Sequence, residues 1–346
     1  MSIVKVAQLA GVSKSTVSLV INNSPTIPPQ TALKVRQAMS ALSYVPCPRE
    51  QRKGPKPGGA GAKWTQNIAL CAIGFPAAVL RAPLYSDVLH GIEGGVRERN
   101  YRLTLSHLPN PKDWGVDEIM RSGAEGFLLF GGGESDAAAR ALREFPCVTL
   151  MGAQDVRPWC DWVSFDEVAV GQLAAAHLAQ KGHRTCAFVG MLAGARGNAF
   201  RKAFHAAGGR ATLHDTAGLI RAHDDLHEVD SVGLRKVVEH ILALSPRPTG
   251  IFSWSDILTA ALYPVLHSCG VKPGRDVDVV SCNNEWPLLM GLSPRPAVVD
   301  IQGSKVGRRA VEQLFWRIAH RKESRVVIRL APLLLNATEP AAQNSL

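Results

Sequence analysis

From residue 67 onward, short apolar runs alternate with stretches of helical spacing, and this alternation limits the possible folds more than any other feature. Runs such as residues 67–75 and 123–132 are almost continuously apolar, as strands covered on both faces are. Segments of helical spacing, such as 85–100 and 167–183, stand between them. This order predicts parallel sheets covered by helices, and about 270 residues suffice for two such sheets side by side.

The first 45 residues lack this alternation and instead contain three short stretches of helical spacing. They cover about residues 3–10, 14–22 and 29–42, with Gly11 ending the first and Ser13 able to cap the second. The candidate core positions on their inner faces are Val6, Ala7, Ala10, Val17, Val20, Ile21, Leu33, Val35, Ala38, Met39 and Leu42. Two helices joined at a tight corner, with a third packed beneath, form a helix-turn-helix unit whose second helix can lie in the major groove of DNA.

Positive charge is concentrated at this end of the chain. Residues 1–63 contain nine of the 39 lysines and arginines but only one acid, Glu50, so they carry eight of the ten net positive charges. Residues 46–63 hold four prolines and four glycines, which is typical of an irregular linker. A basic end of this kind favours a polyanion as partner, and an ordinary basic surface is the alternative.

Other features of the whole chain bear on its location and redox state. No apolar run approaches the roughly 20 residues that span a bilayer, and the N-terminus lacks an apolar signal core. The seven cysteines are scattered and form no C-x-x-C pair, as expected for reduced thiols rather than for disulfides or a zinc site. These features predict a cytoplasmic protein without a membrane partner.

The segments VKVAQLAGVSKSTVSLVIN and IPPQTALKVRQAMSALSYVP make the chain similar to the LacI (lactose repressor) family of bacterial transcription regulators. Segments 82–103, 164–190, 253–284 and 296–314 continue the resemblance in the same order. The resemblance implies a DNA-binding headpiece followed by a periplasmic-binding-protein-like effector domain. It also implies a homodimer on a near-palindromic double-stranded operator. A small-molecule effector, such as a carbohydrate or a derivative, would bind in the cleft between the two subdomains.

The resemblance also assigns roles to the second helix. It places three residues at the principal base-reading positions: Lys14, Ser15 and Leu19. It makes three others phosphate or supporting contacts: Thr16, Ser18 and Asn22. Many family members have arginine at the position of Leu19, and a leucine can contact only a thymine methyl or another apolar base edge. We therefore expect a different operator and weaker discrimination at that base; the alternative is that Leu19 packs against the third helix.

The linker departs from the family pattern. Family members follow the Tyr-x-Pro element, here residues 44–46, with a short hinge helix that wedges a leucine into the minor groove. Lys53 stands at about the wedge position, among prolines and a glycine. Proline inside a short helix costs ~3 kcal/mol. We therefore predict that no leucine-type wedge forms and that Arg52 and Lys53 contact DNA phosphates by charge.

Seven residues are candidate effector contacts in the cleft: Tyr85, Arg196, Phe200, Trp254, Ser255, Asp256 and Asn283. Family members that bind sugars grip hydroxyl groups with Asp, Asn and Arg, but here Phe200 stands for the usual arginine and Ser255 for the usual asparagine. The alternatives are core positions for Tyr85 and Phe200 and a helix cap for Asp256. We expect either a ligand that is not a typical neutral sugar or a loss of ligand control.

Together these features predict an α/β chain with three parts. A helix-turn-helix domain covers residues 1–45, a basic linker 46–66, and an effector-binding and dimerisation domain 67–340. Two parallel-sheet subdomains are expected in the last part, the first over about 67–161 and 292–320 and the second over about 162–288 and 325–337. The expected chain crossings between them lie near 161–165, 284–292 and 319–327.

The function that these features favour is a sequence-specific regulator of transcription, most simply a repressor, in the cytoplasm and associated with the nucleoid. Three alternatives are a regulator with a ligand-independent effector domain, a solute-binding protein, and a sugar-active enzyme on a similar fold. The solute-binding protein would need a signal peptide, and no enzyme motif is present: residues 130–135 lack the spacing of a phosphate loop. His223 and His227 have metal-ligand spacing, but a solvated helix face is favoured, so no metal or cofactor is predicted.

Overall fold

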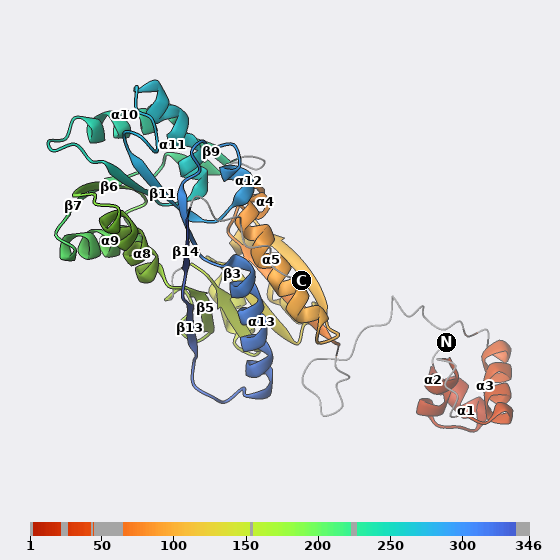
Figure 1. The fold of residues 1–346 in the computed structure, drawn as a ribbon. Coiled ribbons are helices and arrows are strands. Elements are labelled where there is room, and N and C mark those ends of the chain that lie inside the picture. The colour runs from red at the N-terminus through yellow and green to blue at the C-terminus, as the bar shows by residue number, and fades with distance from the viewer. Residues whose placement is uncertain are drawn as a thin grey trace. The chain divides into compact units, whose positions relative to one another are not determined.

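A computed structural model describes residues 3–21, 27–42, 44, 65–152, 155–222 and 227–336 of the chain. The chain divides into two compact units, residues 1–63 (unit 1) and 64–346 (unit 2), which are described separately (Figure 1). None of the helices within these ranges is both long enough and apolar enough to cross a membrane.

Unit 1 contains the three predicted helices, α1 (Ile3–Ala10), α2 (Lys14–Ile21) and α3 (Pro29–Ala41). Their shared core holds six side chains, each no more than 5% exposed: Val6, Ala7, Val17, Val20, Val35 and Ala38. The predicted periodicity is confirmed at these positions, but the prediction for Leu33 was wrong, because its side chain is 58% exposed. Leu33 lies two positions before Val35, and two residues turn a helix by ~200°, so it faces away from the core.

The first sheet of unit 2 has six parallel strands in the order β13-β5-β4-β3-β1-β2. The strands are β1 (Asn67–Ile73), β2 (Arg102–Leu108), β3 (Gly126–Gly131), β4 (Cys147–Leu150), β5 (Asp161–Phe165) and β13 (Val327–Leu330). One face is covered by α5 (Pro83–Arg97) and α13 (Gly303–Ala319), the other by α6 (Val116–Arg121) and α7 (Asp136–Leu142). With the short α4 (Ala77–Arg81) and η2 (Pro111–Asp113), these elements form the first subdomain.

Burial on both faces explains why the strands of this sheet are apolar throughout. Along β1, Ile68 and Leu70 pack under α5 and α13, while Ala69 and Cys71 pack on the opposite face. Helices α5 and α13 approach each other closely at Gly91, where an added Cβ would collide with the backbone oxygen of Ser304. Glycine is therefore required at this crossing.

The second sheet has the order β14-β12-β11-β10-β6-β7, and only β14 runs antiparallel to its neighbour. Its strands are β6 (Thr185–Gly190), β7 (Arg210–Asp215), β10 (Gly250–Ser253), β11 (Asp278–Asn283), β12 (Ala297–Asp300) and β14 (Leu333–Leu335). Helices α8 (Glu167–Gln180) and α9 (Ala195–Ala206) cover one face, and α10 (Ser231–Leu242) and α11 (Asp256–Ser268) the other (Figure 1). The second subdomain also contains α12 (Trp286–Leu289) and a hairpin of β8 (Ile220–Ala222) and β9 (His227–Val229).

The chain crosses between the two sheets at three places, and each lies one strand beyond the predicted one. Strand β5 pairs with β4 and β13 pairs with β5, so 162–165 and 327–330 belong to the first sheet although both were expected in the second subdomain. Strand β12 pairs with β11 in the second sheet, although residues 292–320 were expected in the first subdomain. Apolar strands look alike in the sequence, and only backbone pairing decides which sheet each one joins.

Candidate nucleic-acid interface and ligand cleft

Helix α2 begins with a cluster of hydroxyl groups. Ser13 caps the helix as predicted, because the backbone N–H of Thr16 donates to Ser13 Oγ at 3.1 Å. Ser13 Oγ also lies 2.8 Å from Ser15 Oγ and 2.9 Å from Thr16 Oγ1. Lys14 is exposed beside them. Hydroxyls and backbone N–H groups at a helix N-terminus are suited to contact phosphate oxygens.

Leu19 is exposed on the outer side of the same helix. Its side chain is 41% exposed, whereas Val17 is fully buried and Val20 is 5% exposed. This exposure argues against packing of Leu19 on α3. Ser15 and Leu19 are four residues apart and share one side of α2, and Lys14 lies ~100° round the helix from Ser15, so the three exposed side chains span one solvent-facing arc of ~140°.

The structure describes only some of the remaining side chains that were predicted to contact DNA. Thr16 is half-buried, with its hydroxyl in the cluster at Ser13. Ser18 lies within α2, but its side chain is outside the described residues, as are Asn22, Arg52 and Lys53. The roles of these four side chains, including the charge-based contacts of the linker, stay predictions.

Buried polar atoms without partners gather where strands of the second sheet end. Ser255 Oγ follows β10, Asn283 Oδ1 ends β11 and Thr216 Oγ1 follows β7, and none of these buried atoms has a hydrogen-bond partner in the described part of the chain. Tyr85 Oη on α5 of the first subdomain is likewise buried and unpaired there. Ligands of parallel α/β sheets bind at the carboxyl ends of strands, so these atoms are candidate contacts for a ligand in the predicted cleft. Thr216 was not among the predicted residues.

An apolar wall lies on the side of the first subdomain. Tyr85, Phe130, Met151, Val79 and other apolar side chains line a cavity of about 70 Å³. The Tyr85 ring packs against Phe130 at 5.5 Å between centroids, while burial raises the pKa of its hydroxyl to about 12. Tyr85 therefore combines a packed ring, as in the core alternative, with a neutral hydroxyl that has no hydrogen-bond partner among the residues described.

Arg196 is tied into the second subdomain and is not available to a ligand. Its Nε and Nη2 donate to the Glu167 carboxylate at 2.6 and 3.2 Å, and Nη1 donates to the backbone oxygen of Trp254 at 2.6 Å. The guanidinium also lies over the half-buried Trp254 ring, 5.4 Å from its centroid. Arg196 thus joins α8, α9 and the end of β10.

Phe200 is a core residue, and its prediction as an effector contact was wrong. The side chain is fully buried; its ring stacks on Phe204 at 5.8 Å and packs at a tilt against Phe252 at 5.3 Å between centroids. The core alternative is correct, because α9 turns this side chain onto the sheet rather than toward the strand ends.

Asp256 is buried and holds the turn after β11. One carboxylate oxygen accepts a hydrogen bond from Ser281 Oγ, and the other accepts from the backbone N–H of Glu285 at 2.6 Å. Its prediction as an effector contact is contradicted, and so is the helix-cap alternative, since the carboxylate is consumed by this turn. Burial raises the pKa of Asp256 to about 7, and the nearby Glu285 carboxylate adds to this shift. The turn holds Asn283 at φ 110°, a left-handed conformation that costs ~1–3 kcal/mol.

Glu285 links the two subdomains and was missed by sequence reasoning. Its Oε1 accepts from the backbone N–H of Leu84, in the first turn of α5, at 3.2 Å. Its Oε2 accepts from Asn283 Nδ2 at 3.1 Å. Since Leu84 precedes Glu285 by 201 positions, no local sequence signal could have indicated this contact.

Arg157 and Glu134 form a buried ion pair at the strand ends of the first sheet, and sequence reasoning missed it too. Arg157 Nε and Nη2 each donate to the Glu134 carboxylate at 2.7 Å, and Nη1 donates to the backbone oxygen of Gly131 at 2.9 Å. Arg157 and Arg196 are therefore both neutralised by carboxylates. Neither can receive an anionic ligand without losing its partner.

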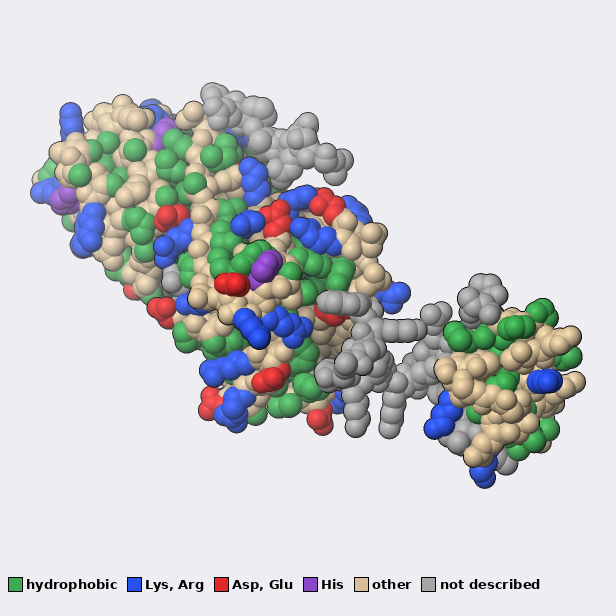
Figure 2. All heavy atoms as spheres, turned by 90° about the horizontal axis from the view of Figure 1, so that it is seen from below, with side chains coloured by type: hydrophobic (Ala, Val, Ile, Leu, Met, Phe, Trp, Pro, Cys, Tyr) green, Lys and Arg blue, Asp and Glu red, His purple; other side chains and the backbone are tan. Residues whose placement is uncertain are grey.

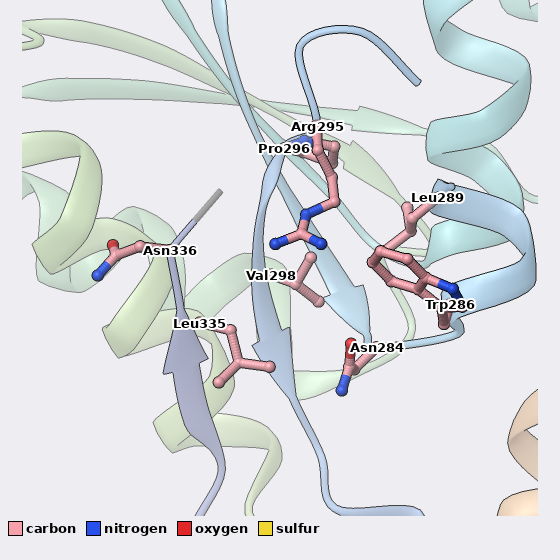
Figure 3. Close-up of a pocket in the computed structure, with 8 residues that line it drawn as sticks. All are labelled: Asn284, Trp286, Leu289, Arg295, Pro296, Val298, Leu335 and Asn336. Carbon is pink, nitrogen blue, oxygen red and sulfur yellow. The ribbon is translucent and has the colours of Figure 1, made fainter. Parts of the chain in front are cut away.

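A further depression beside the Asn284 turn is too small for a ligand. Figure 3 shows Arg295 reaching from the loop before β12 toward Val298 and Trp286. The guanidinium lies 5.0 Å from the Trp286 ring centroid. The remaining space is about 10 Å³, which is room for about one water molecule.

The described residues contain no group of three His, Cys, Asp or Glu side chains arranged to hold a metal ion. His223 and the side chain of His227 lie outside the described residues. The absence of a metal there stays a prediction.

Two models of known protein families match the chain, one over the headpiece that contains α2 and one over most of the second subdomain. Residues 2–47 match the family model of bacterial regulatory proteins of the lacI family, and residues 175–335 match that of a periplasmic binding protein-like domain. The chain belongs to the LacI family. The predicted family and the predicted fold class, a helix-turn-helix headpiece followed by a periplasmic-binding-protein-like α/β domain, are confirmed. As a LacI-family member, the chain is a DNA-binding regulator of transcription.

Relatives and solved structures of this family match almost the whole chain. The transcriptional repressor PurR of Mannheimia succiniciproducens is 24% identical over 340 residues, covering 95% of this chain and 96% of that protein. The ribose operon repressor of Escherichia coli K12 is 24% identical over 344 residues, covering 95% and 97%. The Lac repressor bound to ONPG is 18% identical with a TM-score of 0.64, covering 97% of this chain and 98% of that one. The regulator CelR in complex with cellobiose is 22% identical with a TM-score of 0.61 and the same coverage.

Proposed function

We propose that this LacI-family regulator is a repressor that binds a near-palindromic operator as a homodimer. The observation that carries the proposal is the outer side of α2, where Lys14, Ser15 and Leu19 face solvent while Val17 and Val20 anchor the helix in the core. A dimer places two such helices in successive major grooves. Relatives named as repressors support the direction of regulation. Its place of action is the nucleoid in the cytoplasm.

Each exposed side chain of α2 has a role in this proposal. Lys14 donates to guanine, Ser15 bonds to a base edge or phosphate, and Leu19 contacts a thymine methyl. Thr16, Ser18 and Asn22 set the register on the phosphates, and Arg52 and Lys53 of the linker add charge contacts. Base contacts then determine the operator sequence, while the phosphate contacts set salt-dependent affinity.

A selection from random duplex DNA tests the proposal. The full-length protein is offered the pool at near-physiological salt, and the bound DNA is sequenced. We expect enrichment of a palindrome with two half-sites, with Lys14→Ala changing the preferred base at one position in each half-site. Lys34→Ala, which removes an exposed lysine of α3, is the matched control and should keep the motif. Binding without enrichment would mean that unit 1 holds phosphates only.

We further propose that a small ligand in the cleft controls operator binding, in preference to the ligand-independent alternative. The four unpaired atoms of Tyr85, Thr216, Ser255 and Asn283 support this. A buried polar group without a partner costs ~1–3 kcal/mol. A degenerate cleft without a ligand would have no reason to keep four such groups buried, three of them at strand ends of the second sheet.

The chemistry of the cleft restricts the ligand. The wall at Tyr85, Phe130 and Met151 favours an apolar or aromatic portion. The unpaired Asn283 Oδ1 requires a hydrogen-bond donor on the ligand. Since Arg157 and Arg196 are already neutralised, the ligand carries no carboxylate or phosphate. A neutral or cationic compound with an apolar face fits these features better than a typical sugar.

Thermal shift measurements with defined compounds test the ligand class. Adenine and tyramine have an apolar face and donor groups, while ribose, cellobiose and ribose 5-phosphate represent sugars and their phosphates. We expect stabilisation by the first pair and a smaller response in Asn283→Ala. Stabilisation by ribose 5-phosphate alone would contradict the proposed class. No response to any compound, with operator binding unchanged, would favour the ligand-independent alternative.

A further inference from the structure

A cavity separate from the ligand cleft lies at the amino ends of β4 and β5, at the opposite end of the first sheet. Its volume is about 140 Å³, and arginines and the aromatic rings of Phe145 and Trp159 line it. A cavity of about 150 Å³ can hold a benzene molecule. This cavity, which we call the arginine pocket, therefore has room for a phosphate group and a few further atoms.

A buried ion pair forms one side of the arginine pocket. Arg317 donates through Nε and Nη2 to the Asp161 carboxylate at 2.9 and 2.7 Å, and Gln313 Nε2 donates to the same carboxylate at 2.8 Å. Arg317 Nη1 also donates to the backbone oxygen of Glu323 at 2.6 Å. Asp161 and Arg317 neutralise each other and fix the loop that follows α13, so the pocket is held in shape without a ligand.

The other arginines leave the pocket with a surplus of positive charge. Four arginines but only two carboxylates, Asp161 and Glu323, line it. The Arg143 guanidinium lies 5.5 Å from the Trp159 ring centroid, and Arg321 is exposed on the loop after α13. Neither makes an ion pair within the residues that the structure describes. Arg325 is fixed at the rim, since its Nε donates to the backbone oxygen of Cys160 at 2.7 Å.

The face of the first subdomain around the loop after α13 carries charged side chains of both signs. The loop after α13 lies at the lower end of the first subdomain in Figure 1. The view from below in Figure 2 shows Lys and Arg side chains gathered on this face, with Asp and Glu among them. Because the strands are parallel, β1 also begins at this edge.

We propose that the arginine pocket binds the phosphate group of a small metabolite, as a second ligand site independent of the cleft. Arg143 and Arg321 donate to the phosphate oxygens, as guanidinium groups do to oxyanions. Trp159 and Phe145 contact the apolar remainder of the ligand. The concave shape favours a terminal phosphate over a DNA phosphodiester, because the latter is flanked by two sugars and reaches only the rim.

Calorimetric titration of the full-length chain in phosphate-free buffer tests this proposal. The probes are phenyl phosphate, which offers a ring to Trp159, and inorganic phosphate. We expect phenyl phosphate to bind with a Kd below about 1 mM and more tightly than inorganic phosphate. The variant Arg143→Gln/Arg321→Gln should weaken binding about tenfold or more, since each lost contact is a charge-assisted hydrogen bond. Both residues are exposed, so the variant should retain the melting temperature of the parent.

The matched control Arg184→Gln/Arg201→Gln removes the same charge from exposed positions of the second subdomain. It should change the affinity by no more than about twofold. Equal weakening in both variants, or no binding of either probe at about 10 mM, would overturn the proposal. The proposal would also be overturned if Arg143→Gln/Arg321→Gln bound phenyl phosphate as tightly as the parent but bound duplex DNA more weakly. That result would assign these two arginines to the DNA backbone. None of these outcomes depends on the operator or on the cleft ligand.

Discussion

The outer side of α2 and the ligand cleft differ in how their side chains are held. In α2, Lys14, Ser15 and Leu19 lie within six positions of one helix and project into solvent. In the cleft, Tyr85, Ser255 and Asn283 come from three distant elements, and Arg196 is bound to a carboxylate. A DNA-reading surface needs free side chains on a short rigid helix. A cleft instead uses part of its polar groups to hold two subdomains in place and leaves only a few for a ligand.

The largest effect is expected where a predicted cleft residue is in fact core. Phe200→Ala should lower the free energy of unfolding by ~3–5 kcal/mol, because it leaves a cavity between Phe204 and Phe252. Urea unfolding of the full-length protein measures this loss. Val232→Ala on α10, where the side chain is 66% exposed, is the control and should have little effect. A stable Phe200→Ala protein with an altered ligand response would restore Phe200 to the cleft.

A smaller loss of stability is expected from Arg196→Met. The change removes the ion pair with Glu167 and the hydrogen bond to the Trp254 backbone, and Glu167 can still reach water, so we expect a loss of ~2–3 kcal/mol. Arg201→Met, an exposed position of the same helix, should change stability by less than ~1 kcal/mol. Denaturant unfolding compares the two. If Arg196→Met keeps full stability and abolishes ligand binding, Arg196 contacts the ligand after all.

The pH dependence of stability probes the turn beside the cleft. The pKa of Asp256 is raised from 3.8 to about 7 in the folded protein, so between these values the folded state binds the proton that the unfolded state has released. Stability should therefore fall as pH rises from about 4 to 7 and level off above, by up to about 4 kcal/mol. Asp256→Asn should flatten this part of the unfolding profile. An unchanged slope in that variant would assign the dependence to other groups.

The smallest effect is expected on the exposed side of α3. Leu33→Ala should change the free energy of unfolding by less than ~0.5 kcal/mol, whereas Val35→Ala, two residues later, should cost about 2 kcal/mol. Melting curves of the two variants measured side by side check this contrast. Comparable losses would mean that Leu33 is packed in the folded unit.

These contrasts explain which features could be predicted from the sequence. The core of unit 1, the cap at Ser13 and the exposed side of α2 follow from helical spacing, which depends on neighbours within one or two turns. Leu33 was misplaced because a 13-residue helix rich in apolar side chains allows more than one inner face. The family and the α/β architecture were predictable because motifs of the headpiece and the strand–helix order extend along the chain.

The cleft could be predicted only in part, because its geometry depends on contacts between distant segments. Tyr85, Ser255 and Asn283 carry unpaired polar atoms at the predicted positions, but Phe200 is core and Asp256 is consumed by the turn at Glu285. The crossings between the sheets were misplaced because strand pairing is not encoded in the apolarity of each strand. Glu285 and Arg157 were missed for the same reason, since their roles arise from partners that no sequence pattern connects.

The central claim is that the exposed side of α2 reads bases, and Leu19→Arg tests it most directly. Selection from random duplex DNA with the parent and the variant, at the same salt concentration, yields two operator motifs. We predict that they agree everywhere except at one symmetric position in each half-site, where the variant shifts the preferred base toward guanine. Identical motifs, or none in either protein, would contradict the claim that α2 reads the operator through Leu19.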